Sequence, residues 1–227
     1  MLCRLVLNYK KLPYRTEWIE YPDIEAFCQS NGIPPTGTRA DGTGYYSLPA
    51  IHDPKTGIYL AESIEIAEYL DRTYPDTPPA FPDDSLGIQR AFNGALGKGP
   101  LASLWQFIMP LVPSVLNPPS AAYFRRTKKD SVGGKELDEA IPKGEERVVE
   151  WRKLKKGLNL IALWYKPGHP FIMGDTVSWG DFAWGGYLVW IREMFGAESE
   201  DWKDLDSHSE GRWSTLLEAL SDYQEVQ

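Results

Sequence analysis

Cysteine and histidine are scarce in this chain, and their scarcity excludes several kinds of site. The two cysteines are Cys3 and Cys28, and the three histidines lie far apart in the sequence. Two cysteines give neither a disulfide framework nor a structural zinc set, and the histidines lack the spacing of metal ligands. We therefore expect no metal site, and a reducing, cytoplasmic location fits this cysteine usage.

Excess positive charge and long apolar runs are also missing. The 227 residues carry a formal net charge of −8. An acidic surface argues against nucleic acid or an anionic membrane as the main partner, and no apolar run is long enough to span a bilayer. The basic run at 152–156 does not change this expectation, because it follows a helical pattern and is expected to be a solvated helix face.

Aromatic residues, in contrast, are abundant, with 9 Trp, 12 Tyr and 8 Phe. This number predicts a large aromatic core, and it leaves open that some of these side chains line an apolar ligand pocket. The content of 42% hydrophobic and 25% charged residues is ordinary for a soluble protein of one or two domains.

The first 75 residues combine helical and strand patterns. Alternation of polar and apolar residues predicts a strand at 14–21, and a turn at 54–57 predicts a hairpin. The predicted elements, in order, are the end of a helix at 1–11, the strand at 14–21, a short helix at 23–30 capped by Asp23, a loop at 31–46, the hairpin at 48–60, and a helix capped by Ser63 that ends at Pro75.

The rest of the chain shows no strand pattern. The proline-rich stretch 76–84 reads as a stiff linker and predicts two domains, 1–78 and 79–227. The sequence from Ser178 to Asp181 has the form of a capping box that starts a buried helix. Helices are predicted at about 85–113, 118–130, 143–166, 179–194 and 212–224.

The stretch from Leu48 to Ser63 points more clearly to a ligand than the rest of the sequence. A strand entered through Pro49 and a helix that starts beside the acidic and hydroxyl pair Glu62 and Ser63 can together hold the charged end of a small peptide. Read without any family context, Leu48 and Pro49 also fit an ordinary strand opening, and Ser63 also fits a simple helix cap beside a solvated Glu62.

These segments resemble, in order and spacing, the soluble glutathione transferases over nearly all of the chain. The matching pieces are Leu48-Pro49-Ala50-Ile51, Glu62 through Leu70, and Gly174-Asp175 through Ser178 and Asp181. Finer details are similar to the fungal etherase-like, or fungal-specific A, group, which is related to bacterial β-etherases. They are Trp18 through Ile24, Gly144-Glu145-Glu146-Arg147 and Gly211-Arg212-Trp213.

The resemblance implies an α/β thioredoxin-like amino-terminal domain, an all-α carboxy-terminal domain and glutathione as co-substrate. In the family the proline matching Pro49 is cis, and the backbone at Leu48 pairs with the cysteinyl part of glutathione. Glu62 would pair with its α-amino group, and Ser63 with the helix N–H groups would receive its carboxylate. The family also implies a homodimer and an acceptor pocket for aromatic or phenolic electrophiles between the domains. Trp105, Tyr123, Phe124 and Trp179 are candidates for the pocket wall.

One part of the family pattern has no counterpart. The family begins with a strand followed by a catalytic Ser, Tyr or Cys, whereas here Leu5-Val6-Leu7 already resembles the helix after that position. The catalytic residue therefore stays unknown. The chain is expected to be an amino-terminally shortened form; a variant that binds without catalysis and a substitute segment in the gap are the alternatives. Cys3 is a further candidate nucleophile, although it falls inside the helix.

The expected function is glutathione conjugation of aromatic electrophiles, or glutathione-dependent ether cleavage, in the complete form, which is detoxification chemistry. The alternative is a ligandin-type protein that holds glutathione conjugates or plant-derived phenolics without turnover. A non-catalytic interaction module is a third possibility, and an appended domain would distinguish it.

Overall fold

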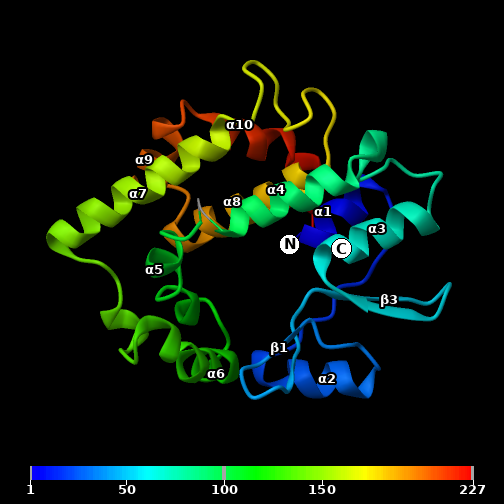
Figure 1. The fold of residues 1–227 in the computed structure, drawn as a ribbon, viewed down its shortest axis with the longest axis horizontal. Helices are drawn as coiled ribbons and strands as arrows, with labels where there is room; N and C mark the ends of the chain where they lie inside the picture. Colours follow the sequence, from blue (N-terminus) through cyan, green and yellow to red (C-terminus); the bar gives the residue numbers. More distant parts are fainter. Residues whose placement is uncertain (1, 99–100, 226–227) are drawn as a thin grey trace.

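A computed structural model describes residues 2–98 and 101–225. The first part of the chain forms a thioredoxin-like half with short strands, and the rest forms a helical half (Figure 1). The elements of the thioredoxin-like half are α1 (Leu2–Tyr9), η1 (Tyr21–Asp23), α2 (Ile24–Ser30), β1 (Gly37–Thr38), β2 (Gly44–Tyr45), β3 (Ala50–Asp53), β4 (Ile58–Ala61) and α3 (Ser63–Thr73).

The predicted hairpin is present, and helices cover both of its faces. Strands β3 and β4 pair antiparallel, with Ala50 opposite Ala61 and Ile51 opposite Leu60. Because successive side chains in a strand point to opposite faces, these two pairs face opposite ways. Ala61 packs in a small cluster with Cys28 of α2, whereas Ile51 and Leu60 pack against the main core of the protein.

The prediction of a strand at 14–21 is wrong. Among the described residues, 12–20 belong to no strand or helix, and β3 pairs only with β4. A strand is defined by its hydrogen-bonded neighbour, and no described segment lies beside 14–21 to pair with it. The alternation of polar and apolar residues alone therefore did not suffice to predict a strand, because the segment has no partner for backbone hydrogen bonds.

The segment 31–46, predicted as a loop, contains a second small hairpin. Gly37 lies opposite Tyr45 and Thr38 opposite Gly44. Asp41 accepts hydrogen bonds from the backbone N–H and the hydroxyl of Thr43 at 2.9 and 2.6 Å, which closes the turn. This loop is thus folded back on itself beside α2.

The helical half differs from its prediction in two places. The predicted helix at 85–113 crosses residues 99–100, which lie outside the described residues, and its described parts form several short helices. A helix at 200–208 was not predicted. The elements are η2 (Pro82–Asp84), α4 (Leu86–Lys98), α5 (Trp105–Ile108), η3 (Val112–Ser114), α6 (Pro118–Lys128), η4 (Asp130–Val132), η5 (Leu137–Glu139), α7 (Gly144–Ala162), α8 (Trp179–Phe195), α9 (Glu200–His208), α10 (Arg212–Ala219) and η6 (Ser221–Tyr223).

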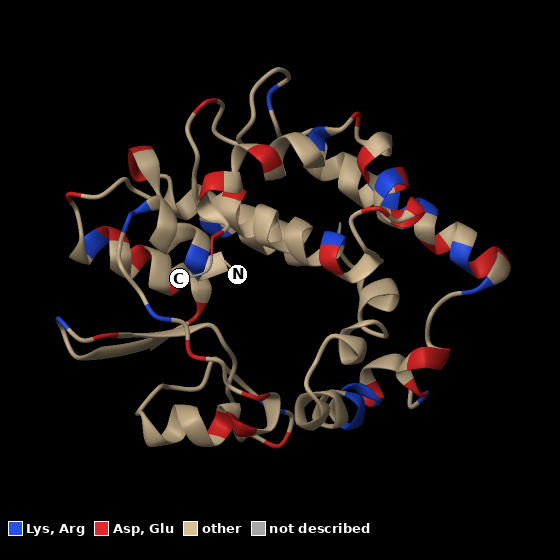
Figure 2. Cartoon of the chain, turned by 180° about the vertical axis from the view of Figure 1, so that it is seen from behind, with Lys and Arg blue, Asp and Glu red and all other residues tan. Residues whose placement is uncertain are grey.

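Helix α8 forms the centre of the core, as its apolar sequence predicts. Its first eight residues are all buried, and it carries no charge along most of its length, whereas α7 carries charges of both signs (Figure 2). The predicted capping box is confirmed, because the Ser178 side chain and the Asp181 carboxylate each bond the other's backbone N–H. Ring contacts of Phe182 with Tyr9 and Tyr223 join α8 to α1 and η6.

A buried ion pair fixes the segment that leads from α3 into the helical half. The Lys10 ammonium is buried and donates to Asp71 at 2.7 Å and to the Pro78 carbonyl at 3.1 Å. Asp71 also accepts the backbone N–H groups of Ala80 and Phe81 at 2.9 and 3.0 Å. The buried ammonium of Lys10 is therefore paired and hydrogen-bonded, as burial of an ion requires.

No helix in the described ranges combines the length and the apolar character needed to cross a membrane.

Candidate functional site

The hairpin register brings the two predicted halves of the site together. Ala50 pairs with Ala61, so the residues before Ala50 and after Ala61 meet at the same end of the hairpin. Those residues are Pro49 and Glu62, with Leu48 and Ser63 next to them. The Leu48–Pro49 peptide bond is cis.

Glu62 adopts a backbone conformation that is rare for its residue type. Its φ is +72°, in the region that favours glycine. The side chain is exposed, and no hydrogen bond or ion pair of its carboxylate is found among the described residues. A strained residue with an exposed, unengaged carboxylate at the end of a strand is a candidate for ligand binding.

Ser63 lies at the start of α3 but does not cap it. The N-cap position is Glu62, and no side chain in the described structure caps this helix. The prediction that Ser63 caps α3 is therefore wrong, since its hydroxyl lies one residue too far along. The first N–H groups of a helix lack intrahelical acceptors and stand at its positive end. This end of α3, with the Ser63 hydroxyl, suits a carboxylate ligand.

A buried polar network fixes the hairpin to α3 and so holds the site together. The Asp53 carboxylate of β3 accepts from the hydroxyls of Tyr69 and Tyr74 at 2.6 and 2.7 Å. Burial alone would raise the pKa of Asp53, but these hydroxyl donors lower it below the ordinary value. The hydrogen bond to Asp53 raises the pKa of Tyr74 to about 12. The hairpin is thus linked to α3 by side-chain hydrogen bonds as well as by the chain itself.

The structure argues against either cysteine as a nucleophile. Burial raises the pKa of Cys3 to about 12, with the charge of Glu62 adding to the effect and the amino terminus opposing it. Burial also raises the pKa of the Cys28 thiol. Both are free thiols in the interior, and a protonated thiol is a poor nucleophile. The influence of Glu62 on Cys3 also means that the start of α1 lies near the site.

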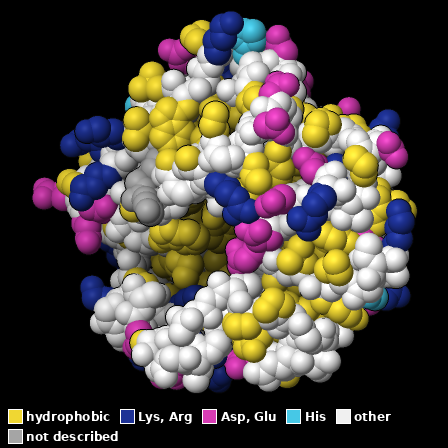
Figure 3. All heavy atoms as spheres, turned by 45° about the vertical axis from the view of Figure 1, so that its right-hand side comes forward, with side chains coloured by type: hydrophobic (Ala, Val, Ile, Leu, Met, Phe, Trp, Pro, Cys, Tyr) yellow, Lys and Arg dark blue, Asp and Glu magenta, His cyan; other side chains and the backbone are white. Residues whose placement is uncertain are grey.

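A deep hollow lined with hydrophobic side chains opens between the two halves, and acidic and basic residues stand at its rim (Figure 3). Of the four aromatic residues predicted as wall candidates, Trp179 and Phe124 are buried in the core. Trp105 is 38% exposed, and Tyr123 is half-buried. Only Trp105 and Tyr123 therefore remain available to a ligand.

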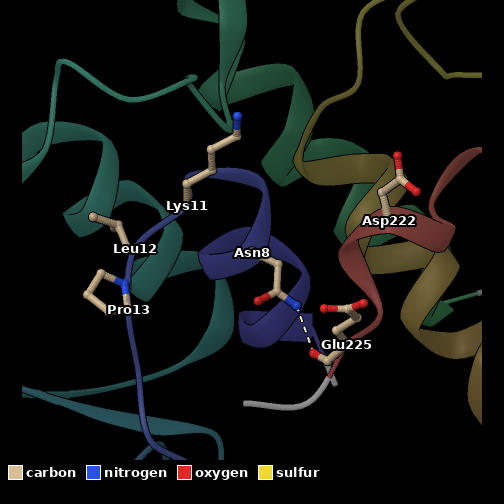
Figure 4. Close-up of a pocket in the computed structure, with 6 residues that line it drawn as sticks. All are labelled: Asn8, Lys11, Leu12, Pro13, Asp222 and Glu225. Carbon is tan, nitrogen blue, oxygen red and sulfur yellow. Dashed lines mark hydrogen bonds between the residues drawn. The ribbon is translucent and has the colours of Figure 1, made fainter.

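Two further cavities lie away from the hairpin. One, of about 280 Å³, lies between α1 and η6 and is lined by Asn8, Lys11, Leu12, Pro13, Asp222 and Glu225. Asn8 donates to the carbonyl of Glu225 at 2.8 Å, while Lys11 extends away from it (Figure 4). The other, of about 430 Å³, lies along α7 and α9 and includes Trp151 and Arg152. Neither contains a residue of the predicted site.

No cluster of three or more His, Cys, Asp or Glu side chains suited to a metal ion is found within residues 2–98 and 101–225.

Comparisons with known proteins agree with this architecture. The family described as "Glutathione S-transferase, N-terminal domain" matches residues 2–73. The family described as "Glutathione S-transferase, C-terminal domain" matches residues 87–223. The chain belongs to the glutathione S-transferase family. The expected fold, a thioredoxin-like domain followed by an all-helical domain, is confirmed.

Two similar solved structures come from fungi. A glutathione S-transferase of Ceriporiopsis subvermispora, solved in complex with glutathione, is 38% identical with a TM-score of 0.94 and matches 100% of this chain and 90% of its own. Glutathione transferase GSTFuA3 from Phanerochaete chrysosporium is also 38% identical, with a TM-score of 0.91 and the same coverage. The expected likeness to a fungal group is thereby confirmed.

A curated relative is also fungal. The glutathione S-transferase-like protein ustS of Aspergillus flavus is 31% identical over 99% of this chain and 83% of its own length.

Sequence reasoning missed the residues that join the two halves at η1 and α6. Glu20 and Tyr21 contact Asn117, Ser120 and Tyr123 across about 100 residues of sequence. The order Asn117-Pro118-Pro119-Ser120 did signal a helix start, but nothing in it pointed to a carboxylate from the other half.

Proposed function

We propose that this chain binds glutathione at the open end of the β3–β4 hairpin, using Leu48, Pro49, Glu62 and Ser63. The observation that supports this is the Ala50–Ala61 pairing, which brings an exposed carboxylate, an uncapped helix start and the cis Leu48–Pro49 bond to one place. The family, and the glutathione complex of the Ceriporiopsis relative, favour the same ligand.

Each part of the tripeptide has a complementary group in this arrangement. The Glu62 carboxylate pairs with the α-amino group of the γ-glutamyl residue, and the Ser63 hydroxyl and the N–H groups of α3 receive its carboxylate. The Leu48 backbone pairs with the cysteinyl residue as an added strand.

The proposed acceptor is an aromatic or phenolic electrophile in the hydrophobic hollow. Trp105 of α5 lies 5.7 Å from Trp190, ring centre to ring centre, and remains partly exposed. In the proposed reaction, the glutathione thiolate attacks the acceptor and displaces a leaving group, or it cleaves an aryl ether by displacing the aryl oxygen. Such conjugation is detoxification chemistry.

A ligandin-type function is the second candidate, and the cysteines favour it for this chain. Cys3 and Cys28 are buried, and burial raises the pKa of both thiols, so neither is an activated nucleophile. A binder of glutathione conjugates or phenolics needs the hollow and the hairpin site but no activated sulfur.

The proposal includes two domains, 1–78 and 79–227, and a homodimer in the cytoplasm. Exposed apolar residues on α4 and at the end of α7, Ile88, Leu160 and Leu163, provide surface for a second copy. The two free thiols fit a reducing compartment. Light scattering on the wild type and on Ile88→Asp tests the dimer; a monomeric wild type would contradict it.

Calorimetric titration with glutathione and with S-(2,4-dinitrophenyl)glutathione tests the binding site. Glu62→Ala should weaken both ligands by about 10- to 100-fold, because it removes a charged partner of the amino group. Glu145→Ala is the matched control, since Glu145 is an exposed carboxylate in the first turn of α7. Equal affinity in wild type and Glu62→Ala would overturn the assignment.

Conjugation of 1-chloro-2,4-dinitrobenzene with glutathione separates the two candidate functions. Turnover above the uncatalysed rate supports the transferase. Tight binding of the conjugate without turnover supports the ligandin.

A further inference from the structure

Among the described residues, the two halves of the molecule meet in a main interface and in a second, separate contact. In the main interface α1 contacts α8 and η6, and Arg90 of α4 pairs with Glu65 and Glu68 of α3; the second contact joins η1 to α6. In Figure 1 these contacts lie on opposite sides of the central opening, and Figure 3 shows the hollow between the halves. The η1–α6 contact therefore closes the hollow on the side away from the main core.

The polar part of this second contact is centred on Glu20. Its carboxylate accepts from the Asn117 amide at 2.6 Å and from the Ser120 hydroxyl, while the Tyr21 backbone N–H donates to that hydroxyl at 2.8 Å. Ser120 is buried, and its hydroxyl both donates and accepts a hydrogen bond, as a buried polar group requires. The donors from Ser120 and then Asn117 lower the pKa of Glu20.

Glu20 lies at the start of α6, where its carboxylate bonds side chains rather than backbone N–H groups. The helix begins with Pro118 and Pro119, which have no backbone N–H, and its N-cap residue Asn117 makes no capping hydrogen bond. The negative charge of Glu20 lies at the positive end of the helix, where it is favoured. We call this set, Glu20, Tyr21, Asn117 and Ser120, the clasp.

Aromatic contacts extend the clasp along α6. The Tyr21 ring stacks on Tyr123 with centres 6.5 Å apart and meets Phe124 edge-on at 5.8 Å. The other main contacts of α6 are to η3 and η4, which flank it in sequence. Phe124 anchors α6 in the main core, and the clasp holds the start of the helix to the thioredoxin-like half.

We propose that Glu20 is a positioning residue that holds α6 as one wall of the hollow and thereby limits the size and entry rate of apolar ligands. The part of this inference that concerns apolar ligands rests on the proposed function, whereas the part that concerns the position of α6 does not. Opening of the clasp moves α6 away from η1 and widens the hollow, and closure shields the ligand from solvent.

Stopped-flow binding of 8-anilinonaphthalene-1-sulfonate and of its larger dimer, bis-ANS, tests the size and rate effect. Glu20→Ala should raise the entry and exit rates about tenfold, with more effect on bis-ANS, because a charged pair of hydrogen bonds is lost. The dissociation constant should change much less than either rate. Ser120→Ala should behave like Glu20→Ala, and Ser120→Thr, which keeps the hydroxyl, should restore wild-type rates.

Glu17→Ala is the matched control, because Glu17 lies three residues away and pairs only with Arg15 among the described residues. Unchanged rates in Glu20→Ala, or an equal change in Glu17→Ala, would overturn the proposal.

If neither probe binds the wild type, the exchange rates of the backbone amides of α6 test the positioning role of Glu20 directly. The lack of probe binding would count against the ligand hollow, and the clasp would then be judged by amide protection alone. Glu20→Ala should lower the protection of residues 120–128 at least tenfold while α8 keeps its own, and Glu17→Ala should change neither. Unaltered protection of α6 would overturn the positioning role.

Discussion

The helical half and the thioredoxin-like half are stabilised by different interactions. In the helical half, Phe182 and Trp184 of α8 are fully buried in a continuous apolar core. The thioredoxin-like half shares this core through α1 and α3. It also has a small cluster of its own that includes Cys28 and Ala61, and its hairpin is held to α3 by the Asp53 network. Substitutions in the core around α8 should therefore unfold the protein. Substitutions in the Asp53 network should loosen the candidate site within an intact fold.

The largest expected effect is the loss of the whole fold by a change in α8. Phe182→Ala removes a buried ring that also contacts Tyr9 of α1, and such a change costs about 3–5 kcal/mol. Urea unfolding should show one transition at lower concentration, with both halves lost together. Phe92→Ala, where the ring is half-buried, should cost clearly less. Separate transitions for the two halves would contradict the shared core.

The second effect concerns pH and the buried carboxyl at the start of α8. Burial raises the pKa of Asp181 to about 7, against hydrogen bonds from Ile172 and Ser178 that lower it. The folded state thus keeps a proton that the unfolded state has already lost above about pH 4. Stability should fall as pH rises from about 4 to 7, by an amount on the order of 3–4 kcal/mol.

The variant Asp181→Asn tests whether this carboxyl group causes the pH dependence. The variant should be less stable, because it loses an acceptor, but it should lack this pH dependence. Denaturant unfolding at pH 5 and pH 8 measures the free energy of unfolding of both proteins. An equal change between the two pH values in wild type and variant would contradict the prediction.

The smallest effect has the opposite sign and lies in the thioredoxin-like half. The folded-state pKa of Asp53 is below its ordinary value, so its contribution is present above about pH 4 and is lost as pH falls further. Asp53→Asn should cost about 2 kcal/mol at pH 7 and should weaken glutathione binding without unfolding the helical half. Circular dichroism and calorimetry at pH 7 test both outcomes. Unchanged affinity would show that the network does not support the site.

The parts of the fold that were predictable were those fixed by local sequence. The turn at 54–57 determined the β3–β4 hairpin, and the box from Ser178 to Asp181 determined the start of α8, because each depends on residues close in sequence. The strand at 14–21 was wrong because pairing depends on a distant partner. Helix α9 did have a local signal: Ser199 accepts from the N–H of Trp202 as an N-cap.

The candidate site was predictable in its residues but not in its geometry. The resemblance indicated Leu48, Pro49, Glu62 and Ser63, but the left-handed conformation of Glu62 and the uncapped start of α3 required coordinates. The clasp was out of reach of any local pattern, since Glu20 and Ser120 are 100 residues apart.

The most direct test of the central claim is a titration of the isotope-labelled protein with glutathione, followed by backbone amide shifts in nuclear magnetic resonance spectra. We expect the largest shifts at Leu48, Ser63 and Ile64, and their loss in Glu62→Ala. Shifts confined to the groove between α7 and α9, or no shifts at millimolar glutathione, would contradict the claim that the open end of the hairpin holds the tripeptide.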